Sequence, residues 1–138
     1  MAKLKRKRGR GVDATGRSKG EDQFVLIPYT MARSPAFRSL SGAALKVWVE
    51  LRCRFNGGNN GKLSLSWDEA ARLLGLSKGT VGRAFNELQE KGFIVMTKRG
   101  QWYGRLATTW AVTDKSHQGH LATHAWKHWK PPAKKVRA

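Results

Sequence analysis

The chain has 138 residues, 40% of them hydrophobic, a length and composition that suit one domain with a single core. It carries 27 lysines and arginines against 9 aspartates and glutamates, for a formal net charge of +18, and no apolar run approaches the roughly 20 residues that span a bilayer. The opening "MAKLKRKRGRG" lacks the apolar stretch of a secretory signal, so we expect a cytoplasmic protein whose partner is a polyanion such as nucleic acid.

The positive charge is concentrated at the two ends. Residues 1–20 hold eight cations and one acid, and residues 115–138 hold six cations and no acid. Residues 1–22 contain almost nothing apolar, which predicts a disordered basic arm, and a segment with only Leu4 to enter lipid does not favour a membrane surface. The arm resembles the minor-groove arms of other DNA-binding proteins and would add affinity more than specificity. Its cations are Lys3, Lys5, Arg6, Lys7, Arg8 and Arg10.

The folded domain is expected over residues 23–114. "FVLIPY" (24–29) reads as an extended lead-in packed on the core, and "SPAFRSL" (34–40) as a short helical turn.

The first long helix is predicted over 42–55, with Ser41 as its cap. Arg52 falls inside the apolar arc of this helix, either as a snorkelling stem or as half of an ion pair. Cys53, the only cysteine, is expected to be a small buried residue with no chemistry. The apolar positions at helical spacing are Ala44, Leu45, Trp48, Val49, Leu51 and Phe55.

A second helix is predicted over 67–74, after a turn at "NGGNNGK" and a short β segment "KLSLS". Ser66 and Glu69 have the spacing of a capping box, and Gly75 is expected to end the helix. The residues that share its apolar face are Trp67, Ala70, Ala71 and Leu74.

A third helix is predicted over 78–91, capped by Ser77 and followed by Gly92. The residues expected to face inward are Val81, Ala84, Phe85 and Leu88. "FIVMTKR" and "RLATTWAVT" then predict a β-hairpin with "GQWYG" at its tip, so the fold class is α+β with a three-helix core.

This order resembles the winged helix-turn-helix fold. In helix-turn-helix units a small residue is followed four positions later by a turn glycine and six further on by a β-branched residue, a pattern that Ala71, Gly75 and Val81 match. "SKGTVGRAFNELQEKGFI" is also similar to the recognition helix and first wing strand of bacterial winged-helix proteins such as GntR-type and MarR-type regulators.

A closer resemblance covers most of the chain. The stretch from "IPYTMARSPAFRSLSGAALKVW" to "KLSLS", with the helix-turn-helix and "LATHAWKHWKP", is similar to small basic winged-helix proteins of alphaproteobacteria and their mobile elements. More remotely it resembles the amino-terminal DNA-binding domains of phage and plasmid replication initiators. The resemblance implies binding of double-stranded DNA.

In such a fold the amino-terminal half of the third helix reads bases in the major groove. Arginine can bond guanine and asparagine can bond adenine in a bidentate manner, which makes Arg83 and Asn86 the most informative side chains. Glu87 and Glu90 are expected further along, where the helix leaves the groove. The predicted base-reading residues are Lys78, Gly79, Thr80, Gly82, Arg83 and Asn86.

The hairpin tip is the second predicted contact and would position the protein on the DNA backbone. Trp102 or Tyr103 can pack on sugars, although Trp102 could equally fold back on the core. The predicted backbone contacts are Ser77, Lys98, Arg99, Gln101, Trp102 and Arg105.

The tail, residues 115–138, is basic and aromatic and contains all four histidines, His117, His120, His124 and His128. Three or four of them could align on one helical face as metal ligands, but no cysteine or carboxylate completes the set, so no metal or other cofactor is predicted. The favoured interpretation is that Leu121, Trp126 and Trp129 pin the tail onto the domain or onto a second subunit.

Enzymatic motifs fail on inspection. "GGNNGKL" has Leu63 where a phosphate loop needs serine or threonine, and no nucleophile, base and orienting residue can be assembled. We therefore predict a non-catalytic, sequence-preferring DNA-binding protein, a transcriptional regulator or a mobile-element or replication accessory factor, possible as a homodimer and associated with the nucleoid. Two alternatives stay open: an architectural DNA binder of low specificity, and an RNA-binding module.

Overall fold

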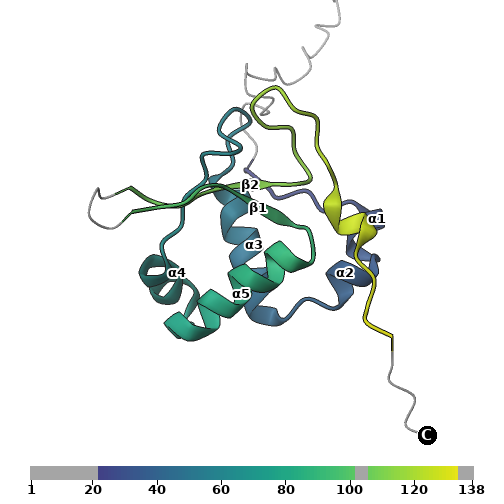
Figure 1. Ribbon diagram of the computed structural model, residues 1–138, viewed down its shortest axis with the longest axis horizontal. Coiled ribbons are helices and arrows are strands. Elements are labelled where there is room, and N and C mark those ends of the chain that lie inside the picture. Colours follow the sequence, from purple (N-terminus) through teal and green to yellow (C-terminus); the bar gives the residue numbers. More distant parts are fainter. Residues whose placement is uncertain (1–21, 102–105, 134–138) are drawn as a thin grey trace, which may run out of the picture.

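The computed structural model describes residues 22–101 and 106–133, and within these ranges the protein is α+β, with five α-helices, one 3-10 helix and a two-stranded antiparallel hairpin (Figure 1). None of the helices in these ranges is long and apolar enough to cross a membrane. Residues 1–21 of the basic arm, residues 102–105 of the hairpin tip and residues 134–138 of the tail lie outside the described residues. The elements are α1 (Tyr29–Ala32), α2 (Pro35–Arg38), α3 (Gly42–Arg54), α4 (Trp67–Leu74), α5 (Lys78–Glu90), β1 (Ile94–Lys98), β2 (Thr109–Val112) and η2 (Ala125–His128).

Serine hydroxyls cap the starts of four helices. Each accepts a hydrogen bond from the backbone N–H three residues later, and the caps are Ser34, Ser41, Ser66 and Ser77. The capping box predicted for α4 is half wrong. The Ser66 hydroxyl does accept from the Glu69 N–H at 3.1 Å, but the Glu69 carboxylate pairs with Arg54 at 2.8 Å instead of returning to Ser66.

Glycines in the left-handed region follow α4 and α5, as predicted. Gly75 has φ 67° and Gly92 has φ 81°, values that cost a side chain strain but suit glycine. Gly92 has a second constraint, because a Cβ there would lie 2.7 Å from the backbone carbon of Ala125. The start of η2 therefore packs directly on the end of α5.

The core lies between α3 and α5 and is completed by the hairpin and η2. The inward face predicted for α5 is confirmed, since Val81, Ala84, Phe85 and Leu88 are all buried. The face of α3 is shifted from the prediction: Val47 is buried, whereas Leu45, Val49 and Phe55 are only partly buried. The prediction for Cys53 is wrong. Its thiol is exposed because position 53 lies outside the stripe of residues 44, 47, 48 and 51 that meets the core.

Arg52 forms an ion pair with Asp114, so the second of its two predicted roles is the correct one. Its Nε lies 3.2 Å from the Asp114 carboxylate, in a contact without the alignment of a hydrogen bond, and both side chains are 6% exposed. The guanidinium also lies 5.4 Å from the centre of the Phe55 ring. The pair joins α3 to the chain just after β2.

The two strands pair in antiparallel register, with Ile94 opposite Val112 and Met96 opposite Trp110. A register irregularity follows Met96. The predicted β segment at 62–66 is reduced to one bridge, in which Leu63 and Trp110 exchange backbone hydrogen bonds of 3.2 and 2.8 Å. β2 thus lies between Leu63 and β1.

The described part of the tail packs on the same chain. The Trp126 ring is buried and stacks on Phe93 with planes 6° apart, and Trp129 is partly buried beneath the Lys91 ammonium. Leu121 is 88% exposed and does not pack on the domain, and its packing on a second subunit stays a prediction. The two tryptophans, in contrast, lie against the end of α5.

Candidate nucleic-acid interface

Helix α5 presents one face to the core and leaves the opposite face exposed. Its buried residues fix its orientation against α3 and β1, and the exposed positions include Gly79, Arg83 and Asn86. From Lys78 to Asn86 the helix contains no acid. The exposed face therefore has a cation, an amide and a small residue in the arrangement that the sequence predicted.

A short hydrogen-bonded chain of side chains orients Arg83. The hydroxyls of Ser77 and Thr80 lie 2.8 Å apart, and Arg83 Nη2 donates to Thr80 Oγ1 at 3.2 Å. Arginine has five N–H donors, so this contact leaves most of them free for a base or phosphate. Thr80 thus orients Arg83. The sequence could have indicated this role, because residues three positions apart on a helix are neighbours on its surface.

Lys78 pairs with Asp68 at the start of α4. Both side chains are more than 70% exposed, and an exposed ion pair of this kind contributes little to stability. Asp68 lowers the positive potential beside the start of α5. Lys78 is accordingly a weaker cation at this surface than the sequence alone indicated.

Gly82 does not belong to the exposed face, which corrects its predicted base-reading role. It is buried, and a Cβ at this position would lie 3.0 Å from the Trp67 ring. Gly82 is instead the point where α4 approaches α5 closely. Trp67 covers it and stays 52% exposed, so the prediction that Trp67 packs on the inner face of α4 is only partly right.

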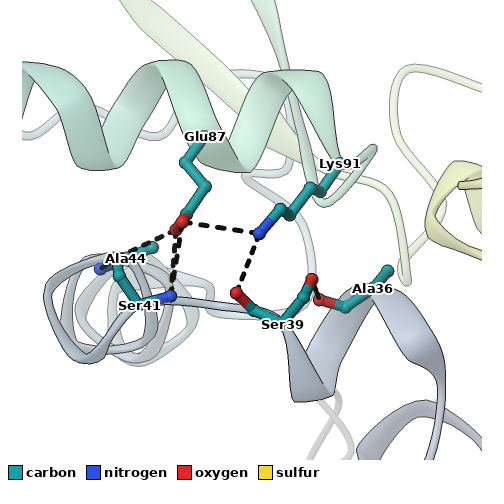
Figure 2. Close-up of polar contacts among 6 residues, drawn as sticks. All are labelled: Ala36, Ser39, Ser41, Ala44, Glu87 and Lys91. Atoms are coloured by element: carbon teal, nitrogen blue, oxygen red, sulfur yellow. Dashed lines mark hydrogen bonds and ion pairs between the residues drawn. The ribbon is translucent and has the colours of Figure 1, made fainter. Parts of the chain in front are cut away.

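Glu87 is turned away from the candidate surface by contacts with α3 (Figure 2). Its carboxylate accepts from the Ser41 backbone nitrogen at 3.1 Å and from the Ser41 hydroxyl at 2.9 Å. Lys91 lies 3.4 Å from the same carboxylate and donates to the Ser39 carbonyl at 2.9 Å. One of the two acids late in α5 is therefore neutralised within the fold, whereas Glu90 is exposed.

The hairpin supplies further exposed polar residues. Lys98, Arg99 and Gln101 are exposed, and Gln101 pairs with Leu106 through backbone hydrogen bonds of 2.9 and 3.0 Å. Figure 1 shows β1 and β2 running toward the side of the molecule where α4 and the start of α5 lie. The predicted contacts Trp102 and Arg105, together with Tyr103, lie outside the described residues.

Arg54 fixes α4 relative to α3, a role that the sequence did not reveal. Its guanidinium contacts Glu50 at 3.1 Å, Glu69 at 2.8 Å and the Ser64 carbonyl at 3.2 Å. The hydrogen bond to Glu69 raises the pKa of Arg54, and the same bond lowers the pKa of the Glu69 carboxyl, with a smaller contribution from Arg72. The pair thereby sets the position of Trp67 and Asp68 beside α5.

The four histidines do not align on a helical face. His117 and His120 face each other across a tight turn, His124 precedes η2, and His128 ends it. In the part of the chain that the structure describes, no group of three or more His, Cys, Asp or Glu side chains could hold a metal ion.

Comparison of the chain with protein-family models, with curated proteins and with solved structures finds no match.

Proposed function

We propose that the protein is a non-catalytic winged helix-turn-helix protein that binds double-stranded DNA and prefers certain base sequences over others. It would act as a transcriptional regulator or as an accessory factor of a mobile element or of replication. In this proposal α4, the turn at Gly75 and α5 form the helix-turn-helix, and the β1–β2 hairpin is the wing. The order of three helices followed by an antiparallel hairpin is compatible with that fold.

The observation that carries the proposal is the exposed pair Arg83 and Asn86. They lie three residues apart, about one helical turn, on the side of α5 opposite its buried residues. Arginine reads guanine and asparagine reads adenine by bidentate hydrogen bonds, each worth about 1–3 kcal/mol of discrimination. The bond from Arg83 to Thr80 holds the guanidinium along the helix before DNA arrives.

Phosphate attraction is supplied elsewhere in the chain. The first 20 residues carry eight cations and the last 24 carry six, whereas Arg83 and Lys78 are the only cations between Ser77 and Glu90. Attraction between cations and phosphates does not depend on the DNA sequence, whereas contacts with base edges do. The separation of the cationic ends from α5 therefore supports the proposal that α5 recognises bases in a strongly basic protein.

Selection of duplexes from a random DNA library tests the proposal. We expect the full chain to enrich a short sequence containing guanine and adenine at adjacent readable positions. Enrichment of no sequence would favour the architectural alternative, and tighter binding to RNA of matched length would favour the RNA-binding alternative.

We also propose that two copies bind each site, because one short helix reads few base pairs. The selected sequence should then be a near-palindrome with half-sites one or more helical turns apart. Sedimentation of the complex with the selected duplex gives the number of chains bound, and a single chain on an asymmetric site would contradict the dimer.

A further inference from the structure

Residues 117–120, "HQGH", form a tight two-residue turn far along the chain from α5. His117 and His120 exchange backbone hydrogen bonds of 3.0 and 2.8 Å. Gln118 and Gly119 between them have φ values of 48° and 80°, the positive values of a type I′ turn. Residues paired in this way direct their side chains to one face, and the two imidazole ring centres lie 5.9 Å apart.

The turn is fixed to the body of the protein by Asn60 and Gly61. The buried Asn60 amide donates to the carbonyls of Val112, Lys115 and Ser116 at 2.9, 3.0 and 3.1 Å. Gly61 lies against the turn so closely that a Cβ would be 3.2 Å from His117 Cδ2. The histidine pair is thus held in place before any ligand arrives, which reduces the entropy lost on binding.

The two imidazoles line a hollow with room for a ligand. Its volume is about 330 Å³, and its walls include Gly57, Gly58, Asn60 and Leu121 besides the two histidines. Within the described ranges neither imidazole takes part in a hydrogen bond, so the ring nitrogens of both residues are available.

We propose that His117 and His120 together bind one divalent transition-metal ion of the class that prefers imidazole, such as Zn²⁺, Ni²⁺ or Cu²⁺. Zn–N bonds of about 2.0–2.1 Å place two imidazoles on one ion with ring centres roughly 5 Å apart, so small side-chain rotations from 5.9 Å suffice. With two protein ligands the remaining positions are open to water or an external ligand. This site is separate from the DNA-binding proposal.

Calorimetric titration of the untagged full chain with Zn²⁺ tests the site. The exposed thiol of Cys53 is itself a metal ligand, so the titration uses the Cys53→Ser background. We expect one ion per chain, with affinity falling at least tenfold in His117→Ala and in His120→Ala. His128→Ala is the matched control, because His128 is exposed on η2 away from the hollow, and its affinity should be unchanged.

Nuclear magnetic resonance of the histidine ring nitrogens keeps the test independent of the variants' folding. Zn²⁺ should shift the ring signals of His117 and His120 and leave those of His128 in place. Titration without saturable binding, equal shifts of all four histidines, or undiminished affinity in folded His117→Ala and His120→Ala would overturn the proposal.

Discussion

Glu87 caps the start of α3 from the side of α5, by accepting hydrogen bonds from both the backbone nitrogen and the hydroxyl of Ser41 (Figure 2). The two residues are 46 positions apart in sequence. The negative carboxylate lies at the positive end of the α3 dipole, and the contact holds α5, which carries Arg83, against α3, which carries the buried Trp48.

Glu87→Gln should therefore lower the free energy of unfolding by about 1 kcal/mol, because the charge-dependent part of the cap is lost. Urea denaturation followed by tryptophan fluorescence measures the change. Glu90→Gln is the matched control, since Glu90 is an exposed acid on the same helix, and it should unfold like the original protein. Equal stability of the two variants would show that the Ser41 contact contributes nothing.

Breaking the buried pair of Arg52 and Asp114 should have a larger effect. Arg52→Met leaves a carboxylate that is 6% exposed without its counter-ion, which costs about 3–5 kcal/mol. The double variant Arg52→Met, Asp114→Asn should lose less than the sum of the two single variants, because neither charge is then left alone. Additive losses in a double-mutant cycle would mean that the two side chains do not interact.

The pair of Arg54 and Glu69 makes stability depend on pH in the acid range. The folded protein lowers the pKa of Glu69, so the stabilisation is fully present above the pKa of the unfolded chain, about 4.3, and is lost as the pH falls through the lower folded value. The difference in unfolding free energy between the original protein and Glu69→Gln should therefore stay constant from pH 7 to about 5 and shrink as the pH falls below the unfolded pKa of about 4.3. A difference that stays the same throughout the acid range would contradict this assignment.

Substitution of Gly79 should change the stability of the fold and the proposed DNA binding in opposite directions. A Cβ at this exposed position meets only Arg83 Nη1, at 3.6 Å, so Gly79→Ala should stabilise the fold by up to about 1 kcal/mol. The added methyl group would hold α5 off the groove floor and weaken binding to the selected duplex roughly fivefold, or about 1 kcal/mol. Gly42→Ala, at the start of α3 with open space around it, should stabilise the protein without changing DNA affinity. Equal DNA affinity of both variants would remove α5 from the interface.

The helices and their ends could be predicted from the sequence because their causes are local. Ser41, Ser66 and Ser77 each stand three residues before the N–H they cap, and glycines follow α4 and α5 where the chain turns left-handed. The buried stripe of α5 also follows from spacing alone. The short helix α1 was not predicted, since it follows Pro28 and has no side-chain cap, whereas Ser34 caps the equally short α2.

The contacts between elements could not be predicted, because they depend on partners that are remote in sequence. The sequence left Arg52 with two roles, and only the position of Asp114 decides between them. Gly79 and Gly82 look alike in the sequence, but Trp67 covers one and leaves the other exposed. The position of Gly82 three residues before the buried Phe85 was a signal that could have distinguished them.

The most direct test of DNA reading by α5 is the ratio of affinities for the selected duplex and a scrambled duplex, measured at one fixed salt concentration for Arg83→Ala and Asn86→Ala. Each substitution should lower this ratio by a factor on the order of ten or more while the affinity for the scrambled duplex stays nearly the same. Arg38→Ala, which removes an exposed cation on α2, should leave the ratio unchanged. An equal loss of affinity on both duplexes, or an unchanged ratio in both α5 variants, would contradict base reading by this helix.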